Sequence, residues 1–204
     1  MQQNLITPRN SEPLVAASQD FLTASYLITQ RDVFYNRDEF FALVTCFVLE
    51  EEQVDIPTPA ILKPVPLWTG KQLFSVMIRP NKDVNSFVSF EMKEKNYDSN
   101  LKLKHFCPND GYVCFRNNEL ISGNVVKKTI GGGSKTGLLY VILLILRDCG
   151  DLEAARAMDR FSRLCSRFFG GHRGFSIGID DVTPLEELLA LKRAILLEGY
   201  TKVW

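Results

Sequence analysis

The sequence is short of the residues that build most catalytic and metal centres. It has two histidines and five cysteines in 204 residues, and no two cysteines are spaced as C-x-x-C. An odd cysteine count argues against a disulfide framework, and the missing spacing argues against a zinc ribbon. His105, Cys107 and Cys114 come closest to a metal cluster, but a fourth ligand is missing and buried thiols are common core residues. We therefore expect no catalytic residue and no metal site in this chain.

Net charge and a long apolar run are also absent. With 24 basic and 24 acidic side chains, the chain has no overall field that attracts nucleic acid, so any site for a polyanion must be local. The apolar run from Leu138 to Leu146 is about half as long as a bilayer span, and the first residues do not resemble a secretory leader. These absences predict a buried segment and no membrane partner.

Capping patterns predict where three helices begin. In a capping box, the cap side chain and the side chain three residues later satisfy each other's backbone N–H groups. The pairs are Asn36 with Glu39, Thr69 with Gln72, and Thr183 with Glu186. Pro184 suits the first position of the third helix, and Gly199 is expected to end it. Two more helices are expected. One covers 18–30 and is capped by Ser18, and the other covers 151–169, with one apolar face of Ala154, Met158, Phe161, Cys165 and Phe168.

Strand and turn signals lie between these helices. Asn117 and Asn118 separate two alternating segments and tolerate the positive φ of a tight turn, so residues 111–126 predict a hairpin. The proline-rich stretch 55–68 cannot be helical and is expected to be extended. Residues 79–110 are polar and predict loops with short strands. The fold class is therefore α+β, with short strands, a hairpin and several helices.

The run Gly131, Gly132, Gly133, Ser134, Lys135, Thr136 is close to a phosphate-binding loop, but Ser134 stands where G-x-x-x-x-G-K-[ST] requires glycine. A nucleotide-binding protein of that class is therefore disfavoured. Lys127 and Lys128, which we place at a strand end, and Lys135 flank glycines that allow a close backbone approach. These three lysines are candidate contacts for phosphates of RNA or of a nucleotide.

Four arginines recur on one side of the helix predicted over 151–169. Arg156, Arg160, Arg163 and Arg167 are spaced to form one stripe. The stripe indicates a polyanion site or a surface that docks a partner. The alternative is a solvated face balanced by Glu153 and Asp159, which is slightly favoured. Asp180 and Asp181 could hold a cation, but a turn and helix cap is the favoured interpretation because a helix follows.

Five segments together resemble the largest subunit of a multisubunit DNA-directed RNA polymerase, most closely that of eukaryotic RNA polymerase III. They are NLITPRNSEPLVAASQDFLTASYLIT, PTPAILKPVPLWTGKQLFSVMIRPNK, ELISGNVVKKTIGGGSKTGLLYVILLILRDCG, EAARAMDRFSRLC and RGFSIGIDDVTP. They occur in the family's order. The resemblance implies part of a larger polymerase core: residues 1–35 follow the active-site barrel, 36–135 form the pore region, and 136–204 form a helical part of the pore and the start of the funnel.

The resemblance also implies a role in transcription of small RNAs such as tRNA and 5S rRNA, in the nucleus. The family's Asn-Ala-Asp-Phe-Asp-Gly-Asp motif is absent, so the chain is expected to be a fragment that is not catalytic alone, with Mg²⁺ and structural Zn²⁺ elsewhere in the full subunit. Expected partners are other polymerase subunits, especially the second-largest, the DNA template, the RNA transcript and nucleoside triphosphates. Residues implied along the nucleic-acid path are Arg9, Asn10, Gln19, Asp20, Lys127, Lys128 and Lys135. The alternatives are a free-standing binding or assembly module and, less favoured, a nucleotide-binding protein.

Overall fold

The structure is a computed structural model, and it describes residues 5–6, 9, 15–48, 52–84, 87–100, 103–131, 145 and 147–203. The chain divides into two compact units, Met1–Arg173 and Gly174–Trp204. The three-part division expected from the resemblance concerns the polymerase as a whole and stays a prediction. The apolar run from Leu138 to Leu146 lies outside the described residues except for Ile145, which is buried.

The first unit combines helices with two small antiparallel sheets, which confirms the α+β class. Its helices are α1 (Asp20–Thr29), α2 (Arg37–Phe47), α3 (Gly70–Ile78), the short α4 (Lys127–Ile130), and α6 (Asp151–Arg167) with the π-helical turn η2 (Phe168–His172). One sheet pairs β1 (Phe34–Tyr35) with β2 (Trp68–Thr69). The other has the order β3-β4-β5, formed by β3 (Phe90–Lys93), β4 (Tyr112–Arg116) and β5 (Glu119–Ser122).

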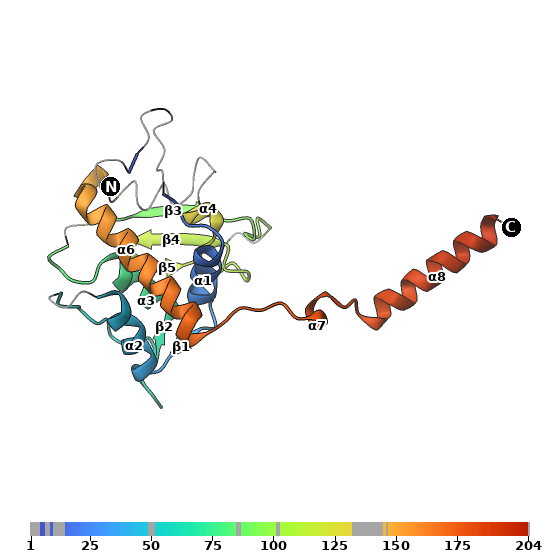
Figure 1. Cartoon of the computed structure of the whole chain (residues 1–204), viewed down its shortest axis with the longest axis horizontal. Coiled ribbons are helices and arrows are strands. Elements are labelled where there is room, and N and C mark those ends of the chain that lie inside the picture. The colour runs from blue at the N-terminus through green and yellow to red at the C-terminus, as the bar shows by residue number, and fades with distance from the viewer. Residues whose placement is uncertain are drawn as a thin grey trace. The chain divides into compact units, whose positions relative to one another are not determined.

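Helix α6 runs across this unit, and α1, α2 and α3 pack against it (Figure 1). Helix α3 also packs on β5, so it lies between α6 and the larger sheet. Phe74 of α3 makes this connection in the core, because its ring lies 6.3 Å from that of Phe115 in β4 and 6.2 Å from that of Phe161 in α6, measured between centroids. Burying each such ring stabilises the fold by roughly 2–3 kcal/mol.

Two of the predicted helix starts are confirmed by their hydrogen bonds. The Thr69 hydroxyl accepts from the Gln72 N–H at 3.2 Å, and Gln72 accepts from the Thr69 N–H at 3.0 Å. The Glu39 carboxylate accepts from the Asn36 N–H at 3.1 Å. Helix 18–30 is confirmed, but the Ser18 cap is wrong: Gln19 is the cap residue, with φ of 43° and no side-chain cap. That positive φ makes a tight turn in which the Ser18 carbonyl takes the Phe21 N–H at 3.0 Å.

The hairpin and the proline-rich stretch follow the sequence patterns. Asn117 and Asn118 have φ of 50° and 68°, the conformation that joins β4 to β5. The proline-rich stretch forms no helix. Its end is fixed where the Trp68 indole N–H donates to the Pro57 carbonyl at 2.8 Å. The α6 face predicted to be apolar packs inward, since Ala154, Phe161, Cys165 and Phe168 are buried.

The second unit contains the short α7 (Ile179–Val182) and the longer α8 (Glu186–Val203). The predicted cap at Thr183 is wrong, because its hydroxyl donates to the Ile179 carbonyl at 2.7 Å and so completes α7, while α8 begins at Glu186. Gly199 does not end α8. The helix continues through it, supported by a Glu198–Lys202 ion pair one turn apart. Asp181 accepts from the Gly178 N–H at 2.8 Å, as expected of a capping residue.

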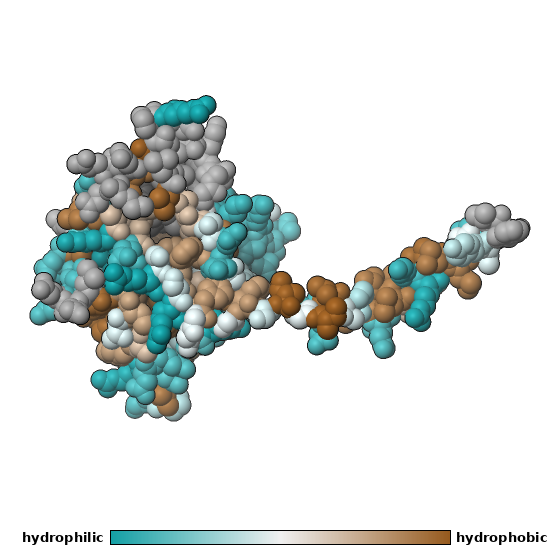
Figure 2. Space-filling view, viewed as in Figure 1, coloured by the Kyte–Doolittle hydropathy of each residue, from teal (hydrophilic) through white to brown (hydrophobic). Residues whose placement is uncertain are grey.

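Helix α8 exposes most of its apolar side chains (Figure 2). They are Leu188, Leu191, Ile195, Leu196, Leu197 and Tyr200. Among the described residues, no helix is both long enough and apolar enough to cross a membrane.

This exposure predicts that the purified chain binds a hydrophobic dye and self-associates, because exposed apolar patches bind each other and such probes. Replacing Leu188 and Ile195 together by Gln is expected to lower dye fluorescence by roughly half and to shift size-exclusion elution towards the monomer. Leu152→Gln is the matched control, since Leu152 is an exposed leucine of the first unit. A wild-type chain that is monomeric and silent to the dye would contradict this expectation.

Candidate nucleic-acid interface

The predicted lysine pair lies at the start of α4, directly before the glycine run. Placing it at a strand end was wrong: Val125 and Val126 belong to no strand, and α4 begins at Lys127. The chain leaves β5 at Ser122 and turns at Gly123, whose φ of 92° suits glycine. The backbone N–H groups of Gly123 and Val125 donate to side chains outside the sheet, so strand pairing stops here. We call residues 123–131 the stem of the glycine loop.

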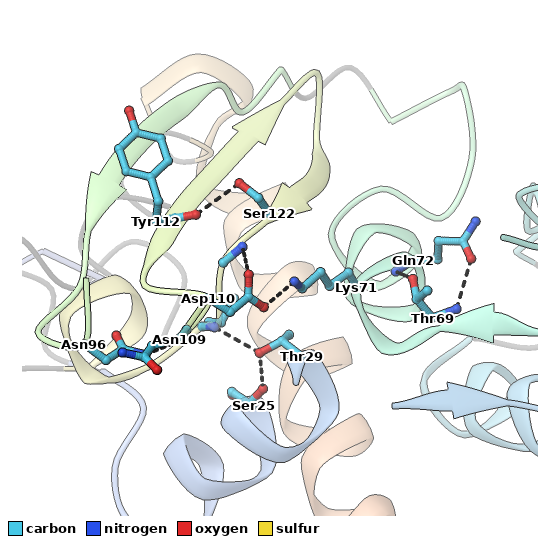
Figure 3. Close-up of polar contacts among 12 residues, drawn as sticks. Ser25, Thr29, Thr69, Lys71, Gln72, Asn96, Asn109, Asp110, Tyr112 and Ser122 are labelled. Atoms are coloured by element: carbon cyan, nitrogen blue, oxygen red, sulfur yellow. Dashed lines mark hydrogen bonds and ion pairs between the residues drawn. The ribbon is translucent and has the colours of Figure 1, made fainter. Parts of the chain in front are cut away.

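A polar network fixes the first half of the stem (Figure 3). The Gly123 N–H donates to the Asp110 carboxylate at 2.9 Å, and the same carboxylate forms an ion pair with Lys71 of α3. The side chains of Asp110 and Lys71 are only 12% and 15% exposed, so water screens this ion pair weakly. The stem is thereby attached to α3.

A second connection reaches α1. The Thr29 hydroxyl accepts from the Val125 N–H at 2.9 Å and donates to the Ser25 carbonyl at 2.7 Å, and all three groups are buried (Figure 3). A buried N–H without a partner would cost about 1–3 kcal/mol, so this hydroxyl makes the irregular backbone of the stem possible.

The second half of the stem is attached to β3. The Thr129 hydroxyl donates to the Glu94 carboxylate, and both side chains are buried. Burial raises the pKa of Glu94, although the hydrogen bond from Thr129 and the charge of Lys128 oppose the rise. Lys128 is half-buried and donates to the Lys93 carbonyl, whereas Lys127 is exposed. Lys128 therefore tethers the stem, and Lys127 is the lysine of the pair that faces solvent.

The other residues implied along the path are only partly brought together. Ala17 forms a parallel bridge with Gly131, so the segment before α1 lies beside the end of the stem. Gln19 and Asp20, which follow Ala17, are exposed at the start of α1. Arg9 is exposed as well. Asn10 and Lys135, together with the glycine run beyond Gly131, lie outside the described residues.

The predicted arginine stripe is wrong at Arg160, which is only 3% exposed. Its guanidinium donates to the carbonyls of Met77 at 2.9 Å and Ile78 at 3.3 Å, the last residues of α3. Burial lowers the pKa of Arg160. The last carbonyls of a helix have no partner within their own helix, and the long arginine side chain supplies one to those of α3.

Two of the other arginines of α6 are paired locally. Arg156 pairs with Glu153 at 2.8 Å, and Arg163 pairs with Asp159 at 2.9 Å. These are the two acids of the solvated-face interpretation. Docking of a partner at Arg156, Arg163 and Arg167 stays a prediction.

Sequence reasoning missed the lysines at the end of β3 and in the loop that joins β3 to β4. The signal was present in FEMKEKNYDSNLKLKHF, where pairs of lysines alternate with aromatic residues. Lys93, Lys95 and Lys104 of this stretch are exposed. Within the described ranges, no group of three histidine, cysteine or acidic side chains is arranged to hold a metal ion.

Comparison with known proteins gives one consistent family. The family model described as RNA polymerase Rpb1, domain 3 matches residues 4–182. The chain is 51% identical to the DNA-directed RNA polymerase III subunit rpc1 of Dictyostelium discoideum over 98% of its length. It is 48% identical to the corresponding subunit RPC1 of Plasmodium falciparum over 100% of its length, and 46% identical to that of Homo sapiens over 98%. It spans only 13%, 8% and 14% of these relatives.

Proposed function

The chain belongs to the RNA polymerase Rpb1, domain 3 family, and we propose that it works as part of the largest subunit of RNA polymerase III. The observation that carries the proposal is the identity of 46–51% to three such subunits across nearly the whole chain. Because the chain spans a small part of each relative, activity belongs to the assembled enzyme. The reaction is nucleotidyl transfer in transcription of small RNAs, and the compartment is the nucleus.

The proposed task of this segment is to line the path that nucleotides enter and backtracked RNA leaves, together with the start of the funnel. Partners are the second-largest subunit and other subunits, template DNA, the transcript and nucleoside triphosphates. Magnesium and structural zinc are proposed to lie in other parts of the full subunit. Magnesium there supplies the charge stabilisation of phosphoryl transfer.

The stem supports an electrostatic role for Lys127. Its connections to α1, α3 and β3 hold the start of the glycine loop in place. Lys127 is exposed on this fixed backbone, and no ion pair to it occurs among the described residues. Because the backbone that carries Lys127 is already held in place, binding a phosphate there does not require that backbone to lose conformational entropy. We propose that Lys135, Arg9, Asn10, Gln19 and Asp20 line the same path, and that Lys128 contributes to it by holding the backbone beside Lys127.

Charge reversal of the lysine pair tests this role. In assembled polymerase III, Lys127→Glu with Lys128→Glu is expected to alter pausing, backtracking and transcript cleavage more than initiation, because each lost phosphate contact removes part of the counterion-release energy. Elongation and cleavage on a defined scaffold at two salt concentrations measure the effect. The single variant Lys128→Met separates tethering from phosphate contact: its effect is expected to depend little on salt, unlike that of Lys127→Glu.

Lys82→Glu is the matched control, since Lys82 is an exposed lysine away from the stem. The proposal fails if backtracking by the double variant equals that of the wild type at both salt concentrations while the complex assembles normally.

A further inference from the structure

The end of β3 and the loop between β3 and β4 carry cations and aromatic rings on a surface that the proposed function has not used. Lys93, Lys95, Lys104, His105 and Phe106 are exposed, and the Phe106 side chain is 74% exposed. We call these five residues the β3–β4 loop surface. In Figure 2, much of the compact unit beside the ends of β3 and β4 is hydrophilic.

Aromatic rings under this surface position its cations. The Lys93 ammonium lies 5.0 Å from the centre of the Tyr97 ring, and the Lys104 ammonium lies 5.8 Å from that of Tyr112. The His105 ring packs edge-on against Tyr112 with centroids 5.2 Å apart. Tyr97 and Tyr112 contact each other at 5.7 Å between centroids. The loop therefore holds its charges on a packed aromatic base.

The acidic side chains near the surface accept hydrogen bonds from other groups, and one of them, Glu91, is also paired with Arg116. Glu94 is buried and accepts from Thr129. Glu91 accepts from the Tyr112 hydroxyl and from Arg116, which together lower its pKa. Asp98 accepts from the Asn100 N–H at 2.9 Å.

The lysines of this surface and of the stem outnumber the acidic side chains near them. Within the described residues, Lys93, Lys95, Lys104 and Lys127 form no ion pair. On α6, Arg156 and Arg163 each have a carboxylate partner. Although the chain as a whole is neutral, with 24 basic and 24 acidic residues, this side of the molecule carries a local positive charge.

The surface is continuous with the stem of the glycine loop. Lys128 donates to the Lys93 carbonyl, and Thr129 donates to Glu94, the next residue. Two neighbouring contacts thus join α4 to the end of β3, and α4 lies beside β3 in Figure 1. A strand of nucleic acid that contacts Lys127 can therefore continue over Lys93.

We propose that the β3–β4 loop surface binds single-stranded RNA and extends the path that begins at Lys127; this rests on the proposed function. The lysines neutralise successive phosphates, and Phe106 offers a ring on which a base stacks. Stacking requires an unpaired base, which favours a single strand over a duplex. An acidic peptide would use the lysines but would gain nothing from the planar ring.

The test measures binding of a labelled oligouridine of about twelve nucleotides to the purified 204-residue chain, by fluorescence anisotropy over a series of salt concentrations. Lys93→Gln with Lys104→Gln is expected to weaken binding roughly tenfold at low salt, and to reduce the slope of log K against log salt by about 1.4, or 0.7 per lost phosphate contact. Phe106→Ala is expected to weaken binding about fivefold with the slope unchanged, because a stack releases no counterion.

Lys63→Gln with Lys82→Gln is the matched control, since both lysines are exposed and lie outside the β3–β4 loop. The inference is overturned if the wild-type chain does not bind the RNA, if a duplex of the same length binds equally well, or if the loop variants behave like this control. Lys127→Gln in the same assay distinguishes the two proposals. If it alone weakens binding, the path at the stem stands and its extension fails. If only the loop variants weaken binding, the loop surface stands and the role of Lys127 fails.

Discussion

Gly70→Ala is expected to destabilise the chain by about 3 kcal/mol or more. Gly70 is the first residue of α3 and is buried against α1, where an added Cβ would lie 1.7 Å from the Ile28 carbonyl oxygen. That oxygen is backbone, so relief requires α1 and α3 to separate. The Phe161 ring of α6, which contacts Phe21 of α1 and Phe74 of α3, would then lose part of its packing. With an m-value of about 2 kcal/mol per molar urea, the unfolding midpoint measured by circular dichroism should fall by roughly 1.5 M.

Gly170→Ala is the matched control for this prediction. A Cβ at Gly170 would meet no atom within 4 Å, so the midpoint should change by less than about 0.3 M. If Gly70→Ala unfolds at the same urea concentration as the wild type, α1 and α3 do not approach each other as closely as the structure shows.

Arg160→Met is expected to destabilise the chain by about 2–3 kcal/mol. Arg160 donates to the carbonyls of Met77 and Ile78, and methionine leaves both without that donor inside the core. Some of the loss is offset because a charged group no longer has to be buried. This offset is incomplete because the two carbonyls stay buried after the substitution and lose their hydrogen-bond donor. A side-chain partner could be removed together with the arginine, but a backbone carbonyl cannot.

Arg163→Met tests whether loss of charge alone has this effect. Arg163 is exposed and paired with Asp159, so its replacement should change the free energy of unfolding by less than about 0.5 kcal/mol in the same urea experiment. Equal stability of Arg160→Met and Arg163→Met would mean that the buried hydrogen bonds only compensate for the desolvation of the charge.

The features predicted correctly from the sequence depend on neighbours along the chain. The Thr69 and Gln72 box needs only three residues of spacing, and the turn at Asn117 and Asn118 needs only side chains that tolerate positive φ. Both follow from local chemistry, as does the apolar face of α6. Errors at helix ends also have a local cause, since Thr183 had two possible helices to cap and its hydroxyl completes the earlier one.

The features that were missed depend on contacts between distant segments. Spacing places Arg160 in line with Arg156, but it cannot show that the end of α3 lies within reach of one and not the other. The candidate site follows the same rule. Their position beside the glycine run made Lys127 and Lys128 candidates, yet their different environments arise because β3 passes beside α4. The residues next to Arg160, Lys127 and Lys128 in the sequence do not indicate either the contact of Arg160 with α3 or that of α4 with β3.

The separation of these contacts along the chain also bears on folding during synthesis. The Thr29 hydroxyl accepts from the N–H of Val125, which lies 96 residues further along the chain. The Phe21 carbonyl accepts from the Cys165 thiol, which lies 144 residues further along. At about 5–20 residues per second, the nascent chain exposes α1 on the order of ten seconds before α6 emerges to cover it. The apolar face of α1 is therefore expected to need a chaperone during translation more than any segment whose partners are close in sequence.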